Sequence, residues 1–184
     1  MTEAPPTWTL FDGERRMAAG PPPEVAAAAH AVAAGDHDGP LLVFDDASGK
    51  VVDLDLRGSA EEVADRYTPK VAPRPRGRPK LGVVAREVTL LPRHWEWLNA
   101  QPGGASVALR KLVEQARRTG ADDRKVRQEA AYRFMASMAG DLPGYEEALR
   151  ALFADDRTAF DARMKSWPAD VAGHAARLAW GSRA

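Results

Sequence analysis

The first 69 residues alternate short apolar runs with turn residues, which is the pattern of a small β-sheet. Residues 7–11 (TWTLF) and 14–20 (ERRMAAG) flank an Asp-Gly turn signal and therefore predict a strand pair. The run LLVF at 41–44 and the alternating VVDLDL at 51–56 predict a hairpin, because turn residues separate them. We expect these four strands to form one sheet.

Two helical patterns belong to the same segment. Prolines at 21–23 can open a helix that stops at Gly35, because proline suits the first turn of a helix and glycine ends one. Ser59 can accept a hydrogen bond from the first turn of a shorter helix that reaches Tyr67. The predicted order is strand, strand, helix, strand, strand, helix.

The sequence changes character after this helix. Residues 68–79 are rich in proline and lack apolar periodicity, which predicts an exposed, extended linker. Beyond the linker, REVTLL at 86–91 is strand-like, and Pro92 can open a short helix. A pair of glycines then breaks the chain before a longer helix with an apolar stripe, which begins near Ser106.

The last third of the chain has helical periodicity interrupted by glycine, proline and paired aspartates. These interruptions divide it into four predicted helices, at about 122–139, 143–154, 156–166 and 169–180. The whole pattern predicts the α+β class. We expect four parts: an acidic α/β domain at 1–69, a basic linker at 70–82, a strand-helix-helix unit at 83–118 and a helical domain at 119–184.

The composition excludes several classes of protein. The 184 residues include no cysteine, which rules out disulfides, thiolate metal sites and thiol nucleophiles. The N-terminus has no basic segment followed by an apolar one, and no apolar run approaches the ~18 residues of a membrane span. We therefore expect a cytoplasmic protein that does not contact a membrane.

The formal net charge of zero conceals an uneven distribution. Residues 1–69 carry 5 basic and 13 acidic side chains, residues 70–118 carry 11 basic and 3 acidic, and residues 119–184 carry 10 of each. A basic stretch of this density is typical of a segment that contacts the phosphates of nucleic acid. The alternative is a solvated linker whose charge only prevents aggregation.

The densest basic stretch, RPRGRPK, resembles the core of the AT-hook, a short element that binds the minor groove of AT-rich DNA. Gly77 has no side chain and lets the backbone approach the floor of the groove, while Arg76 and Arg78 extend along it in opposite directions. Arg74 and Lys80 then lie near phosphates. The alternative is an inert arginine-proline linker.

A second resemblance follows directly downstream. The string REVTLLPRHWEWLNAQPGGASVALRKLVEQARR resembles a ribbon-helix-helix domain, a family in which two chains pair their strands into a ribbon that enters the major groove. The resemblance implies a homodimer paired through residues 86–91, with Arg86 and Thr89 as base readers. It also implies that the backbone N–H groups of Gly104, Ala105 and Ser106 hold a phosphate.

Arg93, at the end of the basic stretch, completes the set of candidate contacts with DNA. The alternative for the segment as a whole is a strand-helix-helix element inside a domain core. Strand residues alternate between two faces, and neither face of REVTLL would present three polar side chains to DNA. The sequence leaves both interpretations open.

Longer stretches of the chain are similar to a bacterial family known as domain of unknown function 2239. The stretches that carry the similarity are VFDDASGKVVDLDLRGS, GRPKLGVVAREVTLLPRHWEWLNAQPGGASVALRKLVEQARR, AYRFMASMAGDLPGYEEALRALFA and WPADV. Together they cover most of the chain. The resemblance implies one unified protein and supplies no catalytic residues.

The sequence contains no recognised catalytic motif. Four histidines occur, and no two lie at the spacing of metal ligands. Asp53 and Asp55 share a face of the predicted hairpin and could act as an acid/base pair, or they could simply point at water. We expect no metal and no cofactor.

These observations favour a DNA-binding protein without enzymatic activity, a transcriptional regulator or nucleoid-associated factor. It would bind AT-rich duplex DNA, and two copies would pair as a homodimer. The alternatives are a protein-interaction or scaffold module with an inert basic linker, and an enzyme that uses the two aspartates.

Overall fold

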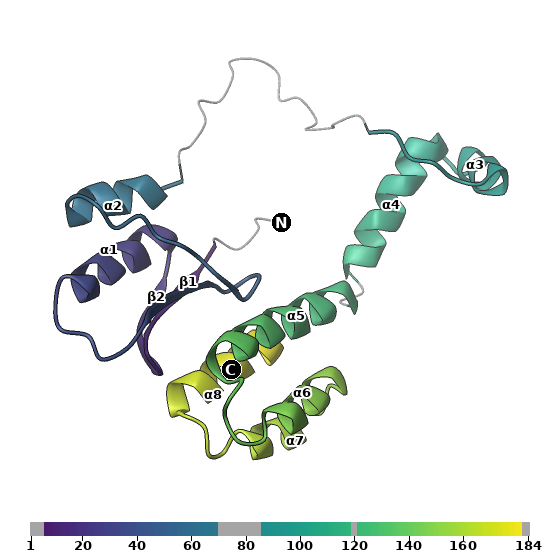
Figure 1. Cartoon of the computed structure of the whole chain (residues 1–184). Coiled ribbons are helices and arrows are strands. Elements are labelled where there is room, and N and C mark those ends of the chain that lie inside the picture. Colours follow the sequence, from purple (N-terminus) through teal and green to yellow (C-terminus); the bar gives the residue numbers. More distant parts are fainter. Residues whose placement is uncertain (1–5, 70–85, 119–120, 182–184) are drawn as a thin grey trace. The chain divides into compact units, whose positions relative to one another are not determined.

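The computed structural model describes residues 6–69, 86–118 and 121–181. Within them it contains a four-stranded antiparallel sheet and eight helices, so the fold is α+β, as predicted (Figure 1). The chain divides into a larger unit, Met1–Pro69 with Asp123–Ala184, and a smaller unit, Lys70–Asp122. None of the helices in the described residues is long and apolar enough to cross a membrane.

The sheet belongs to the larger unit and has the order β2-β1-β3-β4, with every neighbouring pair antiparallel. Its strands are β1 (Trp8–Asp12), β2 (Arg15–Gly20), β3 (Leu41–Asp45) and β4 (Lys50–Val51). The central pair aligns Leu10 with Val43, which places these side chains on one face. Phe11 and Phe44 lie on the opposite face. Both faces are apolar, so each needs a cover.

Helix α1 (Pro22–Ala33) covers the first face of the sheet. Its buried Val25 and Ala29 pack against the pair formed by Leu10 and Val43. A proline occupies the first turn of the helix, where the sequence predicts that the helix begins.

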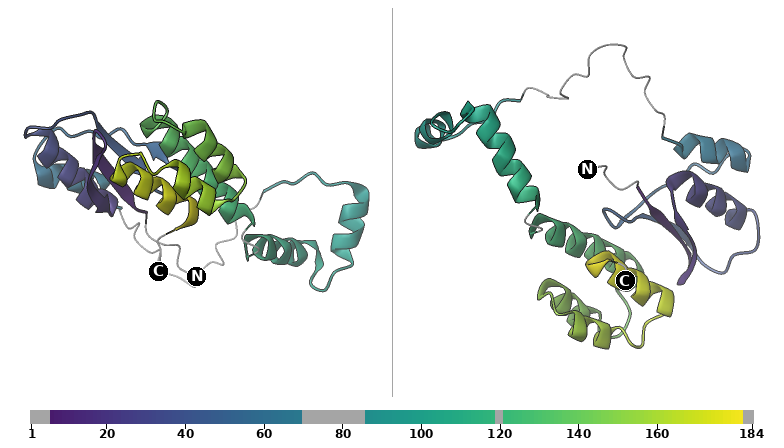
Figure 2. Two further views of the ribbon diagram at one scale, coloured as in Figure 1. Left: turned by 90° about the horizontal axis from the view of Figure 1, so that it is seen from below. Right: turned by 180° about the vertical axis from the view of Figure 1, so that it is seen from behind.

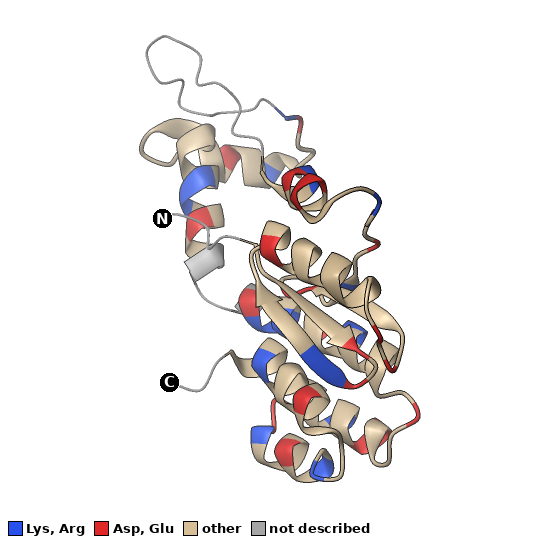
Figure 3. Cartoon of the chain, turned by 90° about the vertical axis from the view of Figure 1, so that its left-hand side faces the viewer, with Lys and Arg blue, Asp and Glu red and all other residues tan. Residues whose placement is uncertain are grey.

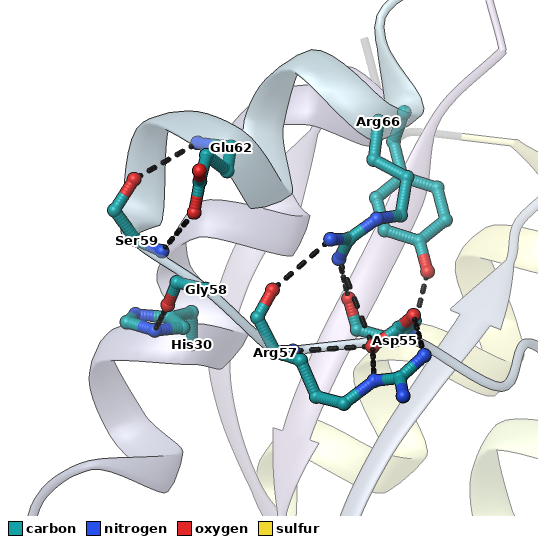
Figure 4. A network of polar contacts seen from close by, with 8 residues as sticks. His30, Asp55, Arg57, Gly58, Ser59, Glu62 and Arg66 are labelled. Carbon is teal, nitrogen blue, oxygen red and sulfur yellow. Dashed lines mark hydrogen bonds and ion pairs between the residues drawn. The ribbon is translucent and has the colours of Figure 1, made fainter.

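Helix α2 (Ala60–Tyr67) lies against α1 and begins with a reciprocal pair of hydrogen bonds (Figure 4). The Ser59 hydroxyl accepts a hydrogen bond from the Glu62 N–H at 3.2 Å, and the Glu62 carboxylate accepts one from the Ser59 N–H at 2.8 Å. This capping box satisfies donors that the first helical turn leaves free. The predicted cap at Ser59 is confirmed, and so is the order strand, strand, helix, strand, strand, helix.

Strand β4 ends at Val51, so most of the strand predicted at 51–56 does not form. Side chains of α2 hold the backbone beyond this point. The Tyr67 hydroxyl accepts a hydrogen bond from the Asp55 N–H at 2.6 Å, and Arg66 donates one to the Asp55 carbonyl. These side chains replace the neighbouring strand that would otherwise satisfy the backbone.

The second face of the sheet is covered by α5 (Ala121–Met138) and α8 (Ala169–Trp180), from the C-terminal part of the chain (Figure 2). Helices α6 (Tyr145–Phe153) and α7 (Arg157–Arg163) pack against α5 and α8 and share their hydrophobic core. Phe134 of α5 packs against Phe11 and Phe44, with ring centroids 5.5 and 4.8 Å away. The sheet and these helices share one hydrophobic core, so the predicted border between an N-terminal and a C-terminal domain does not separate two cores.

The turn between β3 and β4 rests on α5. Gly49 in this turn has a positive φ of 67°, and a β-carbon at this position would collide with the backbone carbonyl of Ala130. Glycine alone fits both conditions. Arg133 also donates a hydrogen bond to the Ser48 carbonyl at 3.0 Å, so the turn is fixed to the helix at two neighbouring points.

The described part of the smaller unit contains two helices, α3 (Pro92–Asn99) and α4 (Gly104–Arg118). Gly103 and Gly104 separate them with φ values of 89° and 72°, in agreement with the predicted glycine break. Residues 86–91 form neither helix nor strand, so the strand predicted there is absent from the single chain. A strand needs a neighbour for its backbone hydrogen bonds, and no described residue supplies one here.

Candidate functional site

The ten predicted contacts with DNA fall into two groups. The five that form the AT-hook-like motif lie outside the described residues: Arg74, Arg76, Gly77, Arg78 and Lys80. The other five lie in the described part of the smaller unit: Arg86, Thr89, Arg93, Gly104 and Ser106. The geometry of the candidate interface rests on this second group.

Four residues of the second group are exposed: Arg86 and Thr89 before α3, Arg93 in its first turn, and Ser106 in the first turn of α4. Gly104 differs, because its backbone N–H donates a hydrogen bond to the Gln101 carbonyl at 2.9 Å. This N–H is therefore already paired within the chain, and the predicted phosphate contact at Gly104 stays a prediction. The exposed cations are accessible to a polyanion.

Net charge follows the boundary between the two units. Lys70–Asp122 carries 11 basic and 4 acidic side chains, and the remainder of the chain carries 15 basic and 22 acidic. The formal charges are therefore +7 and −7. Acidic side chains are spread over the helices and loops of the larger unit (Figure 3). The zero net charge of the chain is the sum of one basic and one acidic unit.

Asp55, one half of the predicted acid/base pair, is bound to Arg57 (Figure 4). The guanidinium donates two hydrogen bonds to the carboxylate, from Nε to Oδ1 at 2.8 Å and from Nη2 to Oδ2 at 2.7 Å. These bonds hold the pKa of Asp55 well below its usual value. The carboxylate stays ionised near neutral pH, which makes it unsuited to proton transfer there. Asp53 is exposed and, like Asp55, lies beyond the end of β4.

The larger unit contains a buried polar cluster that no sequence pattern indicates. Thr9 of β1 donates a hydrogen bond from Oγ1 to Oδ1 of Asp46 at 2.9 Å. Arg177 of α8 lies 3.1 Å from the same carboxylate oxygen, and it donates a hydrogen bond to Nδ1 of His174 at 3.0 Å. Because the arginine donates to Nδ1, the imidazole is neutral and carries its proton on Nε2.

His174 is completely buried between phenylalanine rings of β1 and α5. Burial, together with the positive charges of Arg177 and Arg16, lowers the pKa of His174 to about 3. Its Nε2 lies 3.6 Å from Oδ1 of Asp46, which is too long for a hydrogen bond. The imidazole of His174 is inaccessible to a substrate, and its contacts with Arg177 and Asp46 fasten α8 to the sheet.

Two shallow depressions on the larger unit have volumes of about 630 and 400 Å³. The first lies between α7 and α8, and the second lies between α5 and the β3–β4 turn. Neither is lined by Asp53 or Asp55. These depressions therefore give no support to the two aspartates as a catalytic pair.

The model of an uncharacterised protein family conserved in bacteria, domain of unknown function 2239, matches residues 7–179. The chain belongs to this family. The match spans the sheet, the α3–α4 pair and the C-terminal helices, so the two units are parts of one family protein, as the resemblance implied. No curated protein and no solved structure matches the chain. The family supplies no activity that could be transferred to particular residues.

Proposed function

We propose that the chain is a DNA-binding protein, a transcriptional regulator or nucleoid-associated factor, whose smaller unit binds duplex DNA. The observation that carries the proposal is the separation of charge into a unit of +7 and a unit of −7. Clustered cations bind DNA because they release condensed counterions from its phosphates. A chain that needed charge only for solubility would have no reason to collect its excess cations within one unit.

The basic sequence of the smaller unit favours the minor groove. In the proposed mode, Arg76 and Arg78 lie along an AT-rich groove while Gly77 lets the backbone approach its floor. The exposed Arg86 and Arg93 add contacts with phosphates, which position the protein without reading bases. Preference for AT-rich DNA would thus come from the motif, and overall affinity from all the cations.

Gel-shift titration of AT-rich and GC-rich duplexes at two salt concentrations tests the proposal. The full chain should prefer the AT-rich duplex, and its affinity should fall with salt at a log-log slope of about −0.9 per phosphate neutralised. Arg76→Ala combined with Arg78→Ala should remove the preference, because the groove-filling guanidinium groups are lost.

Two exposed arginines of the larger unit supply the matched control. Arg150→Ala combined with Arg163→Ala removes the same charge and should leave the preference for AT-rich DNA unchanged. Equal binding of both duplexes by the unaltered protein would refute the proposal. A preference that survives in the Arg76 and Arg78 double variant would refute the role of the motif.

The second candidate function is a protein-interaction or scaffold module with an inert basic linker. The observation that favours it is the exposed apolar surface of α3 and α4, which includes Trp97 and Val113. Such a module would retain a protein partner in a pull-down. Its binding would be indifferent to the base composition of added DNA.

A further inference from the structure

The larger of the two depressions, between α7 and α8, has the size of a site for a small molecule. Its volume of about 630 Å³ falls within the range of roughly 300 to 1,000 Å³ that such sites occupy. Its lining combines apolar side chains, from Met164, Ala172 and Ala176, with the cations Arg157 and Arg177. An apolar wall with a few charged groups is the usual composition of a ligand site.

The depression is open on the side of α8 because residue 173 is a glycine. A β-carbon at Gly173 would meet no atom within 4 Å, so a side chain at this position would enter free space. The backbone at Gly173 is helical, and glycine is less favourable in a helix than most residues that have a side chain. The local structure therefore does not require a glycine here. What its small size provides is space between the two helices.

The guanidinium group of Arg157 is held in position at this depression. Its Cζ lies 6.0 Å from the centre of the Trp180 ring, which favours a cation above its face. Its Nε lies 4.0 Å from Oδ2 of Asp161, a distance too long for a hydrogen bond. This Nε is buried and has no hydrogen-bond partner among the described residues. A buried donor without an acceptor is costly, so an oxygen atom from a ligand would be stabilising here.

Arg177 supplies a second guanidinium group, which is partly exposed. Its contacts with Thr9, His174 and Asp46 all use Nη2. Its Nε and Nη1 make no hydrogen bond to any other residue that the structure describes. Among the described residues that line the depression there are two arginines and one acidic residue, Asp161, so their formal charges sum to +1. The lining therefore favours an anion over a cation.

We propose that this depression binds a small carboxylic acid with an apolar body. The carboxylate accepts hydrogen bonds from Arg157, whose planar guanidinium group matches a carboxylate in shape, and the charge of Arg177 adds to the attraction. The apolar body covers Ala172 and Ala176 and fills the space beside Gly173. The site belongs to the larger unit and does not depend on the proposed binding of DNA.

Nuclear magnetic resonance of the ¹⁵N-labelled full chain, titrated with octanoate, tests the site. Octanoate should shift the amide signals of α7 and α8, including those of Ala172 and Ala176, with a Kd of about 1 mM or tighter. Octanamide has the same apolar body but no charge. It should bind at least about 10-fold more weakly, because it lacks the charge-assisted hydrogen bonds.

A variant that fills the depression tests the location of the site. Gly173→Leu should abolish the octanoate shifts, because the new side chain occupies the space of the apolar body. It should stay folded, since its β-carbon meets no neighbouring atom, and circular dichroism verifies this. Ala162→Leu is the matched control, because Ala162 is exposed on α7 and does not line the depression. This control should bind octanoate as the wild type does.

A second pair of variants tests the role of the guanidinium group. Arg157→Gln should weaken octanoate binding about 10-fold and leave octanamide binding unchanged, because only the carboxylate depends on the positive charge. A purely structural role of Arg157 would weaken the binding of both compounds equally. Arg150→Gln, which changes an exposed arginine of α6, should alter neither affinity.

The outcomes separate this site from the proposed function. The absence of saturable shifts in α7 and α8 up to about 10 mM octanoate overturns the site, and so does unaltered binding by Gly173→Leu. Equal affinities for octanoate and octanamide would reject the carboxylate as the recognised group. A chain that binds octanoate but not DNA would refute the proposed function alone, and a chain that binds AT-rich DNA but not octanoate would refute this site alone.

Discussion

The environment of His174 depends on parts of the chain that are far apart in sequence. Its ring is enclosed between strand and helix, and its Nδ1 accepts a hydrogen bond from Arg177, which also pairs with Asp46. A displaced α8 would leave these polar groups buried without partners, which is costly in a low-dielectric interior. The cluster therefore specifies one position of the helix against the sheet.

We predict that His174 makes the stability of the larger unit depend on pH. Its pKa is about 3 in the folded chain, against an ordinary value of 6.5. Below pH 6.5 the unfolded chain binds a proton that the folded chain does not, so the free energy of unfolding falls as pH decreases toward 3. The loss is at most about 1.4 kcal/mol per pH unit. Above pH 6.5 the ring is neutral in both states and adds no pH dependence.

Urea unfolding between about pH 7 and pH 5 measures this slope, because most carboxylates stay ionised over that interval. His174→Gln should flatten the slope. His94→Gln, which changes an exposed histidine of α3, should leave it unaltered. Equal slopes in the wild-type chain and in His174→Gln would contradict the assignment.

Sequence could locate some of these residues but not their partners. The alternation of polar and apolar residues marked Asp55 as a candidate. Arg57, two positions later, was a local signal of the ion pair, but a search for alternation does not consider it. The cluster of Thr9 and Arg177 joins positions 168 residues apart, so no local pattern could indicate it. The candidate contacts at Arg86 and Thr89 stay predictions, because exposure alone does not establish binding.

Elements whose ends depend on local chemistry were predictable. Ser59 with Glu62, and the prolines at the starts of α1 and α3, set helix boundaries through neighbouring residues. Strands were less predictable, because a strand requires a partner that can lie far away in the sequence. After Val52, side chains of α2 bind the backbone of the segment at 51–56 in place of a strand, and among the described residues the segment at 86–91 has no partner strand.

The contact between the β3–β4 turn and α5 can be tested by changing a single residue. Gly49→Ala should lower the free energy of unfolding by about 2 kcal/mol or more, because the β-carbon meets the Ala130 carbonyl and the backbone is left-handed. Gly173→Ala in α8 is the control, since a β-carbon there meets no atom within 4 Å. Alanine in a helix gains up to about 1 kcal/mol over glycine.

Chemical denaturation of the two glycine variants should therefore move the midpoint in opposite directions. A Gly49→Ala chain as stable as the wild type would mean that the turn can leave the helix without cost.

The two apolar faces of the sheet decide how the whole molecule is organised. A linker after residue 67 predicted separate N-terminal and C-terminal domains, but α1 covers only one face of the sheet. The other face, with Phe11 and Phe44, is completed by helices that begin more than 70 residues later in the chain. The nearly continuous apolar run LLVF was the available signal, because a strand buried on both faces lacks alternation.

We therefore predict that residues 1–69 alone do not unfold cooperatively, since Phe11 and Phe44 lose their contact with Phe134. Adding a separate fragment of residues 123–184 should restore a cooperative transition, followed by circular dichroism on heating. A cooperative transition in the isolated 1–69 fragment would show that the N-terminal sheet is an independent domain.

One hydrophobic core combines residues from the N-terminal and C-terminal parts of the chain, so it cannot be completed until late in translation. Phe44 emerges from the ribosome 90 residues before Phe134, an interval of roughly 5 to 18 s at ordinary rates of translation. Throughout that interval the nascent sheet exposes two phenylalanines that nothing yet covers. The growing polypeptide is then a natural client for chaperones that hold aromatic segments until translation is complete.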